Sequence, residues 1–291
     1  GTLLRMKYLL CLLVVSLFSC SRQKDYNVLL IISDDLTATA VSSYGNTLCQ
    51  TPHIDQLAAE GVLYTKAYAQ YPVCGPSRAS FLSGYYPSAT TTYGYVSGRE
   101  NIGEERKTWP QLFREAGYFT ARVSKILHMG VPIDIENGSD GTDDPASWDE
   151  RYNSQAAEWQ TQGAAELVQG NPEGTLERKG GNVMTVVKAE GDDLVHADGQ
   201  TAETASALIR KHKNEKFFLA VGMVRPHVPF VAPKSYFDPY PFETVVLPQK
   251  EEGDWDDIPE RGINYVTSVN GAMSRIQQKK AIAAYYAAVS F

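Results

Sequence analysis

The chain alternates between short apolar runs and segments with a single apolar face. Residues 27–33 and 217–223 are continuous apolar runs, which predict strands that are buried on both faces. A shorter run at residues 119–124 predicts another strand, and the partial alternation of residues 62–70 predicts one more. Strands that are buried on both faces are typical of a parallel sheet covered by helices.

Helices are predicted between these strands from capping residues and from periodicity. Thr51 and Pro52 are a good N-cap and first helical residue, and Thr108 is a second candidate N-cap. The predicted helices are residues 54–60, 109–116, 201–212 and 279–291. Residues 134–193 and 230–260 are predicted to be mostly long connections, with short inserted elements in the first of them. The alternation of strands and helices favours an α/β fold with a doubly wound, mostly parallel sheet flanked by helices.

The N-terminal residues are predicted to be a targeting segment rather than part of the fold. Met6 and Lys7 precede an apolar stretch, residues 8–18, that is too short to span a bilayer. The stretch ends at Cys20 in a sequence that looks like a bacterial lipobox, and simple signal cleavage nearby is the alternative. We therefore divide the chain into upstream residues plus a lipoprotein signal peptide (1–20), a linker (21–26) and one folded domain (27–291). The expected location is periplasmic or at the outer membrane, with contact to the membrane only through a lipid anchor on Cys20.

The composition is that of a globular protein with a sizeable core, since 43% of the residues are apolar and 21% are charged. The formal net charge is −7 and there is no basic stripe, which argues against a nucleic-acid partner. An anionic substrate can still bind in a local cationic pocket. With Cys20 lipidated, Cys49 and Cys74 are the thiols left in the mature domain. A disulfide between them is the alternative to a chemically modified Cys74 and an unpaired Cys49.

Polar residues follow several predicted strands directly. Asp34 and Asp35 come after the first strand, residues 125–128 after the run at 119–124, and residues 225–227 after the last. Ligands collect at the carboxyl ends of strands in such sheets, so these clusters predict one shared site. The two aspartates are either a solvated turn or ligands of a hard cation, Ca²⁺ or Mg²⁺.

The segment from Cys74 to Arg78 is the second candidate for chemistry. Cys74 is expected at the start of a helix, where unpaired N–H groups and the helix dipole favour negative charge. Arg78 lies one helical turn further on and can point to the same place. The alternative is an ordinary capped helix that contains a buried cysteine.

This segment resembles the motif of the type I sulfatases, Cys-x-Pro-Ser-Arg followed by Leu-(Thr/Ser)-Gly. The matching residues are Cys74, Pro76, Ser77, Arg78, Leu82, Ser83 and Gly84. The resemblance implies an alkaline-phosphatase-like fold and hydrolysis of sulfate monoesters. It also implies that Cys74 is oxidised to formylglycine, whose hydrate is the nucleophile. The oxidation requires a formylglycine-generating enzyme or an anaerobic sulfatase-maturating enzyme as a partner.

The same resemblance implies roles for the polar clusters. Asp34, Asp35 and the formylglycine at position 74 would bind Ca²⁺, with Mg²⁺ also possible on the two aspartates alone. Lys125 would neutralise the sulfate, with Arg78 as a further cation. His128 would take a proton from the hydrate, and His227 would bind sulfate and help to protonate the leaving alcohol. Arg225 is expected to be structural or to lie at the rim of the site. One departure from the family is Ser124, which stands where glycine is usual.

Residues 27–291 resemble, within that family, the iduronate-2-sulfatases and their bacterial relatives. This implies a sulfated sugar of a polysaccharide or glycosaminoglycan as the substrate. Family members continue past a helix like the last one here, into further calcium ligands and another lysine. We therefore expect an N-terminal fragment that does not turn over by itself.

Two other functions remain open from the sequence. One is a phosphodiesterase or phosphonate monoester hydrolase of the same superfold. The other is a surface lipoprotein that binds sulfated glycans without catalysis.

Overall fold

The computed structural model describes residues 25–95, 98–168, 184–249, 251–259 and 273–291. The predicted signal peptide with Cys20 and most of the linker lie outside these residues, so both stay predictions. Across the described ranges, no helix has the length and apolar character needed to cross a bilayer.

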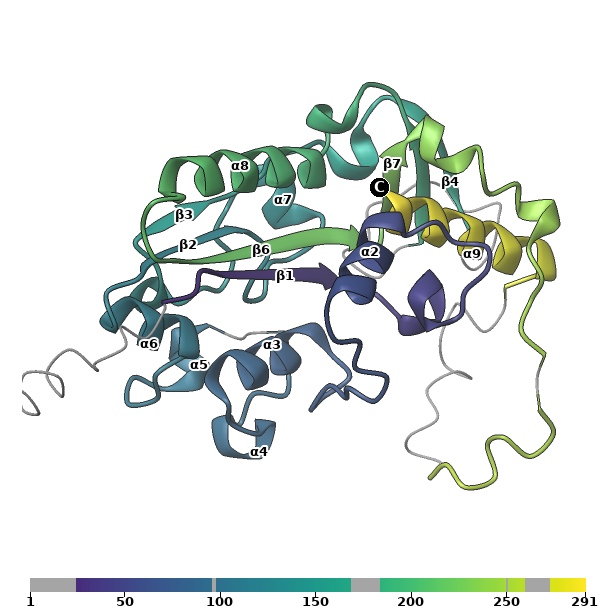
Figure 1. The fold of residues 1–291 in the computed structure, drawn as a ribbon. Helices are drawn as coiled ribbons and strands as arrows, with labels where there is room; N and C mark the ends of the chain where they lie inside the picture. The colour runs from purple at the N-terminus through teal and green to yellow at the C-terminus, as the bar shows by residue number, and fades with distance from the viewer. Residues whose placement is uncertain (1–24, 96–97, 169–183, 250, 260–272) are drawn as a thin grey trace, which may run out of the picture.

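The main sheet is parallel throughout and has the strand order β1-β6-β2-β3. Its strands are β1 (Val28–Asp34), β6 (Phe217–Pro226), β2 (Phe119–Ser124) and β3 (Glu150–Tyr152). The central strand β6 pairs Ala220 with Leu30 of β1 and Leu219 with Ala121 of β2. Because all these strands run the same way, their carboxyl ends meet at one edge (Figure 1). The predicted parallel α/β sheet is confirmed.

Helices cover both faces of this sheet (Figure 1). On one face, α8 (Ala197–His212) packs Ala205 and Leu208 against the strands. On the other face lie α3 (Cys74–Ser83) and α6 (Trp109–Glu115), whose apolar side chains surround the fully buried Phe218. The central strand β6 is therefore buried on both sides, as its continuous apolar run predicts.

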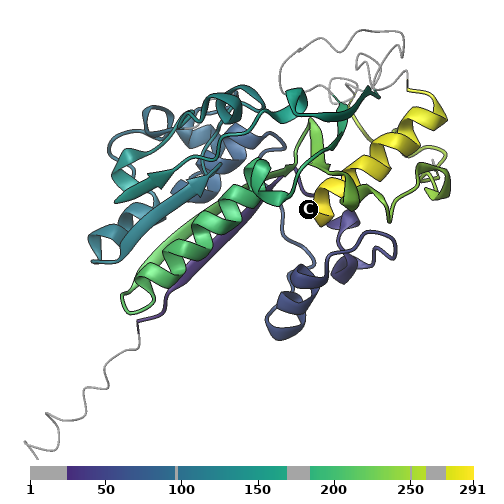
Figure 2. The same ribbon diagram turned by 90° about the horizontal axis from the view of Figure 1, so that it is seen from above.

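The first strand does not fit its prediction completely. It was expected to be buried on both faces, yet Leu29 is 46% exposed and Ile31 is 55% exposed. The physical reason is its place at the edge of the sheet, because α8 packs over β6 and β2 instead (Figure 2). The opposite face of β1 packs on the α3–α6 side as expected.

The prediction of a strand at residues 62–70 is wrong. This stretch forms no strand, and Val62, Tyr64 and Tyr68 are each more than 70% exposed. An alternating pattern produces a strand only where a partner strand and a core face are available. In the described part of the chain, the stretch has neither.

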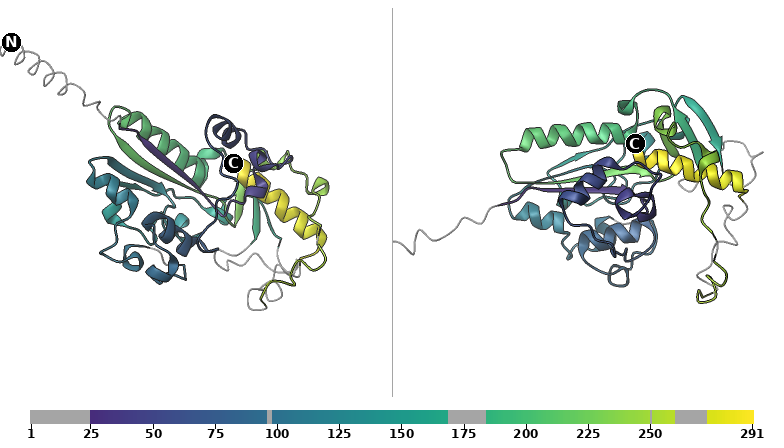
Figure 3. Two further views of the ribbon diagram at one scale, coloured as in Figure 1. Left: turned by 60° about the horizontal axis from the view of Figure 1, so that its bottom comes forward. Right: turned by 45° about the vertical axis from the view of Figure 1, so that its right-hand side comes forward.

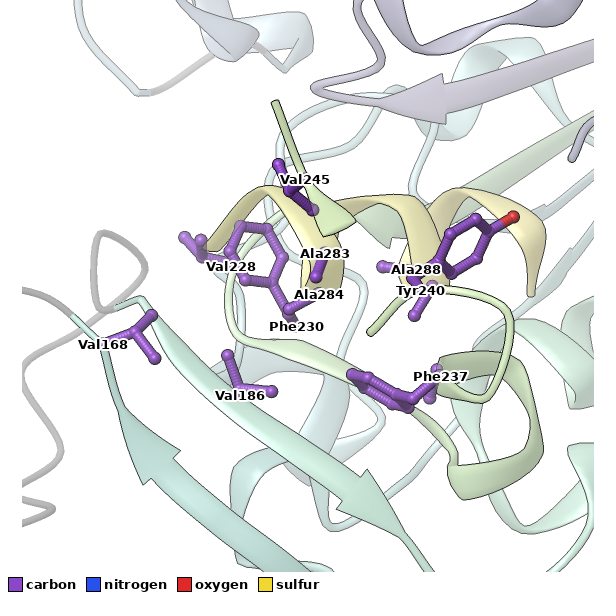
Figure 4. Close-up of a cluster of buried hydrophobic side chains, with 12 residues drawn as sticks. Val168, Val186, Val228, Phe230, Phe237, Tyr240, Val245, Ala283, Ala284 and Ala288 are labelled. Atoms are coloured by element: carbon purple, nitrogen blue, oxygen red, sulfur yellow. The ribbon is translucent and has the colours of Figure 1, made fainter. Parts of the chain in front are cut away.

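A second, smaller sheet lies beside the first and was missed by the sequence prediction. Its strands are β4 (Gly163–Leu167), β5 (Thr185–Ala189) and β7 (Phe230–Pro233), with β4 antiparallel and β7 parallel to β5. Helix α9 (Arg275–Ser290) packs its small residues Ala283, Ala284 and Ala287 against a cluster that includes Phe230 (Figure 4). Such short strands inside Gly-rich or Pro-rich sequence carry little periodic signal.

The predicted helices are confirmed, and three of them begin earlier than expected. Their bounds are α2 Pro52–Glu60, α6 Trp109–Glu115, α8 Ala197–His212 and α9 Arg275–Ser290. Short helices that the sequence did not reveal are α4 (Pro87–Thr90), α5 (Arg99–Ile102) and α7 (Ile133–Asn137). Figure 3 shows that α9 runs beside the second sheet and ends close to the carboxyl edge of the main sheet.

Candidate active site

Cys74 is the first residue of α3 and lies in the wall of a cavity of about 660 Å³. The cavity lies at the carboxyl edge of the main sheet. Asp34, Asp35, Arg78 and His227 also line it. Residues from three polar segments, 34–35, 74–78 and 225–227, therefore meet at this cavity. Such a meeting is expected where the carboxyl ends of parallel strands share one edge.

Asp34 is the charged centre of this site. Its Oδ1 accepts a hydrogen bond from Arg78 Nη2 at 2.8 Å, and its Oδ2 forms an ion pair with Lys125 Nζ at 2.6 Å. All three side chains are at least 96% buried. Burial alone would raise the pKa of Asp34, but the Arg78 and Lys125 charges outweigh it and hold that pKa well below its usual range. Asp34 is therefore ionised.

Lys125 reaches this position because of the backbone around it. Strand β2 ends at Ser124, which has a left-handed φ of 59°. The backbone at Lys125 then passes so close to Gly222 of β6 that a Cβ there would overlap it. Arg78 Nη1 donates to the carbonyl oxygens of Lys125 and Ile126 at 2.7 and 2.8 Å and holds the same turn. The glycine that the resemblance expects at position 124 fits this backbone conformation.

His128 lies against the cysteine. Its Nδ1 is 3.3 Å from Cys74 Sγ. Desolvation, and then the Lys125 charge, lower the pKa of His128 to about 4, so the imidazole is neutral at pH 7. Desolvation also raises the pKa of the Cys74 thiol. A neutral imidazole thus lies beside residue 74, in the position that a proton acceptor needs.

Tyr95 is a site residue that the sequence analysis missed. Its ring lies 5.5 Å from the His128 ring, between centroids, and it also lines the cavity. The contact depends on Gly75, because a Cβ at that position would lie 2.5 Å from the Gly94 carbonyl oxygen and 2.9 Å from the Tyr95 carbonyl carbon. Nothing in the local sequence around Tyr95 signals this approach.

His227 also lines the cavity, in the turn after β6. Its Nδ1 lies 2.6 Å from the Val228 carbonyl oxygen, which can only accept, so Nδ1 carries the proton and Nε2 does not. Burial, followed by the Lys125 charge, lowers the pKa of His227 to about 4. Like His128, it is a neutral imidazole at pH 7.

Arg225 is structural, as predicted. Its Nη1 donates to the carbonyl oxygens of His227 and Pro229, both at 2.8 Å, and its Nη2 pairs with Glu158. The backbone N–H of Arg225 in turn donates to Asp198 at 2.7 Å. These buried carboxylates come from distant segments that the sequence analysis did not single out, and they fix the turn that carries His227.

Asp35 follows β1 with a left-handed φ of 64°, and its exposed side chain forms part of the cavity wall. Desolvation and the neighbouring Asp34 charge raise its pKa. Asp34 and Asp35 are two hard oxygen donors at one cavity, which fits part of the oxygen shell of Ca²⁺ or Mg²⁺. Within the described ranges, no group of three or more His, Cys, Asp or Glu side chains could complete a metal site.

Cys49 is not part of this site. It is buried, its Sγ lies 3.8 Å from the carbonyl oxygen of Tyr286, and it is a free thiol like Cys74. The alternative of a disulfide between the two is therefore wrong for this structure.

Comparison with known proteins agrees with these observations. The sulfatase family model matches residues 26–291. Iduronate 2-sulfatase of Mus musculus is 34% identical over 281 residues, which cover 91% of this chain and 49% of the relative. A sulfatase of Formosa agariphila is 31% identical over 278 residues, again 91% of this chain and 52% of the relative. The chain thus spans about half the length of these curated relatives.

Solved structures share the fold at lower sequence identity. The phosphonate monoester hydrolase SpPMH from Silicibacter pomeroyi superimposes with a TM-score of 0.62 at 19% identity, over 91% of this chain and 56% of that one. A sulfatase-type crystal structure from Bacteroides thetaiotaomicron gives a TM-score of 0.59 at 23% identity, over 92% of this chain and 52% of that one. These likenesses support the alkaline-phosphatase-like α/β fold. The family match extends over nearly the whole domain, and the chain belongs to the sulfatase family.

Proposed function

We propose that this chain is the N-terminal part of an exported bacterial sulfatase that hydrolyses sulfate monoesters of sugars. The observation that carries the proposal is the position of Cys74 in a cavity that Asp34, Arg78 and His227 also line. Beside this cavity, His128 Nδ1 lies 3.3 Å from Cys74 Sγ, and the buried Lys125 pairs with Asp34. A sulfate monoester is an anion, and a closed pocket that offers fixed positive charge stabilises it and its transition state. The family membership adds the reaction class.

Cys74 is the proposed precursor of the nucleophile. Its oxidation to formylglycine by a maturation enzyme supplies a hydrated aldehyde, which has one hydroxyl to attack sulfur and a second for release. A serine at this position could accept the sulfate but would have no second hydroxyl. The start of α3 supports the role, because free N–H groups and the helix dipole there favour developing negative charge.

Arg78 and Lys125 are the proposed cationic contacts to sulfate and to residue 74. Arg78 lines the cavity, Lys125 is fully buried next to Asp34, and both are held in place because Asp34 pairs with each of them. Preorganised charges of this kind need no rearrangement during the reaction, which is why they stabilise a transition state well.

The two histidines are proposed to move protons. His128 lies 3.3 Å from residue 74 and is neutral at pH 7, so it can accept the proton of the second hydroxyl when sulfate leaves. His227 carries its proton on Nδ1, which it donates to Val228, so its unprotonated Nε2 would have to take up a proton before it could pass one to the leaving alcohol. The turn held by Arg225 keeps it in the cavity wall.

Asp34 and Asp35 are the proposed protein ligands of Ca²⁺, with Mg²⁺ as the alternative, together with the modified residue 74. Such an ion would supply Lewis-acid charge at the nucleophile. Two carboxylates give only part of the roughly six to eight oxygens that Ca²⁺ takes, so further ligands are required from elsewhere.

The substrate is proposed to be a sulfated sugar of a polysaccharide or glycosaminoglycan. The support is the likeness to proteins named iduronate 2-sulfatase and to a bacterial sulfatase. The chain spans half of their length, so we expect turnover to require a longer protein. Export and lipidation at Cys20 rest on the sequence alone.

Mass spectrometry of the Cys74 peptide tests this function. After coexpression with a maturation enzyme, conversion to formylglycine should lower the peptide mass by about 18 Da, the loss of sulfur and two hydrogens for oxygen at the nucleophile. Cys74→Ala is the control peptide. A thiol that stays unmodified would support the non-catalytic glycan-binding alternative.

A second measurement separates sulfatase from phosphonate monoester hydrolase, which the shared fold of SpPMH keeps as an alternative. The full-length protein should hydrolyse an aryl sulfate with a higher kcat/KM than the matching phosphate or phosphonate ester. A preference for the phosphorus ester would overturn the assignment.

A further inference from the structure

The hydroxyl of Tyr285 joins α9 to the backbone that follows β1. It donates to the Asp35 carbonyl oxygen at 2.6 Å and accepts from the Thr37 backbone N–H at 2.9 Å. One side-chain oxygen thus bridges two backbone groups that are two residues apart. The bridge spans about 250 positions in the sequence, so it is a tertiary contact that the local turn does not provide.

The segment that it bridges needs such support. Asp35 has a left-handed φ of 64°, a conformation that is strained for a residue with a Cβ. The first backbone hydrogen bond within the turn after Asp35 is the one that the Thr37 carbonyl oxygen accepts from Ala40 N–H. Asp35, Leu36 and Thr37 all line the cavity beside Cys74, so any shift of this backbone would reshape the cavity wall.

The ring of Tyr285 is itself held in place. The Phe230 ring packs edge-on against it, with centroids 5.9 Å apart and planes at 87°. Phe230 begins β7, three residues after His227. Burial raises the pKa of the Tyr285 hydroxyl to about 12, so it keeps the proton that it donates to Asp35.

We propose that Tyr285 is a positioning residue that fixes the backbone of Asp35 and so keeps the Asp35 carboxylate in the cavity wall, ready to bind a divalent cation. The inference rests on the proposed function for the identity of that ligand. Its structural part, the hold on residues 35–37, stands on the two hydrogen bonds alone.

The test uses Tyr285→Phe, which removes only the hydroxyl, and Tyr286→Phe as a matched control. The Tyr286 hydroxyl accepts from Asn46 Nδ2 at 3.2 Å, so the control loses one α9 hydroxyl bond without touching Asp35. Both variants should give circular dichroism spectra like that of the starting protein.

Two readouts are measured on the full-length protein, which can supply the further ligands that Ca²⁺ requires. NMR hydrogen exchange should show the Thr37 amide exchanging about tenfold faster in Tyr285→Phe, as expected for the loss of a hydrogen bond of ordinary strength. Calorimetric titration with CaCl₂ alone should show a Kd that is about tenfold weaker in the same variant. Tyr286→Phe should change neither quantity.

The outcomes separate the two proposals. Unchanged Thr37 exchange in Tyr285→Phe would overturn the positioning inference. Faster exchange with an unchanged Kd for Ca²⁺ would overturn the link from Tyr285 to the cation. If the starting protein binds neither Ca²⁺ nor Mg²⁺, the metal part of the proposed function fails, and the exchange result still decides whether Tyr285 holds the turn.

Discussion

Lys125 Nζ lies 2.6 Å from Asp34 Oδ2 in a site where both side chains are almost fully buried. Because Arg78 binds the other oxygen, one carboxylate balances two cations. A buried charge is tolerated only when it is paired, so these three residues depend on one another for folding as well as for any chemistry.

Asp34→Asn should therefore destabilise the protein strongly. It leaves Arg78 and Lys125 buried without a countercharge, and breaking a buried pair in this way costs about 3–5 kcal/mol. Urea denaturation would measure the loss. Glu203→Gln is the control, because its ion pair with Arg210 is exposed and should contribute less than about 1 kcal/mol. Equal effects of the two substitutions would contradict the buried-triad interpretation.

Stability should fall as the pH is lowered from about 6.5 to about 4. His128 has a folded-state pKa of about 4, whereas an unfolded histidine titrates near 6.5. Over this range the unfolded state binds more protons, so acid favours unfolding, by up to about 3 kcal/mol for a shift of this size. Urea unfolding at several pH values would show the slope.

His128→Gln should flatten that slope, while His227 continues to contribute in the same direction. Asp198 has the opposite effect on the pH dependence. Burial raises its pKa to about 6, so its contribution to the free energy of unfolding is lost as the pH rises through that value. The comparison is therefore between variant and parent at each pH. An identical slope in both would show that His128 is not held neutral by the fold.

Gly75→Ala should disturb the site. The new Cβ would lie 2.5 Å from the Gly94 carbonyl oxygen, and such overpacking costs about 1–3 kcal/mol. It would also push Tyr95 away from His128. Gly94→Ala is the matched control, since a Cβ there meets nothing within 4 Å. Thermal unfolding of the two variants, and the NMR shifts of the His128 ring, would measure the difference.

Ser124→Gly should stabilise the protein. Ser124 has a φ of 59° and a buried hydroxyl with no hydrogen-bond partner. Glycine removes the backbone strain and the unpaired hydroxyl, but it also gives the unfolded chain more conformational freedom. The net effect should be a free energy of unfolding that is about 1 kcal/mol higher. Ser124→Ala removes only the hydroxyl and separates the two effects. A lower melting temperature for Ser124→Gly than for the parent protein would show that the backbone is not strained there.

The strand ends were the part of the site that sequence reasoning could predict. Asp34 and Lys125 follow apolar runs that form the strands on either side of β6 in a parallel sheet, so their meeting needs only the rule that carboxyl ends share an edge. Cys74 and Arg78 were found from local helix chemistry and from the family resemblance. In each case the signal lies within a few residues.

The parts of the site that the sequence did not predict depend on long-range contacts, which leave no local pattern. Tyr95 approaches His128 because Gly75 lacks a Cβ, and Tyr285 reaches Asp35 from the last helix. Glu158 pairs with Arg225 from inside a region that was predicted to be mostly connections. Periodicity could also not show that β1 lies at an edge, because an edge strand and a central strand can carry the same apolar run.

The exposed side of β1 has a practical consequence for handling the chain. Among the described residues, β1 pairs only with β6, and its Leu29 and Ile31 face solvent. An edge strand of this kind is a template on which copies of the chain can aggregate. Protein concentration therefore becomes a variable in every binding or unfolding measurement. Light scattering over a dilution series should accompany them, and Ile31→Lys is the substitution that would keep the chain dispersed.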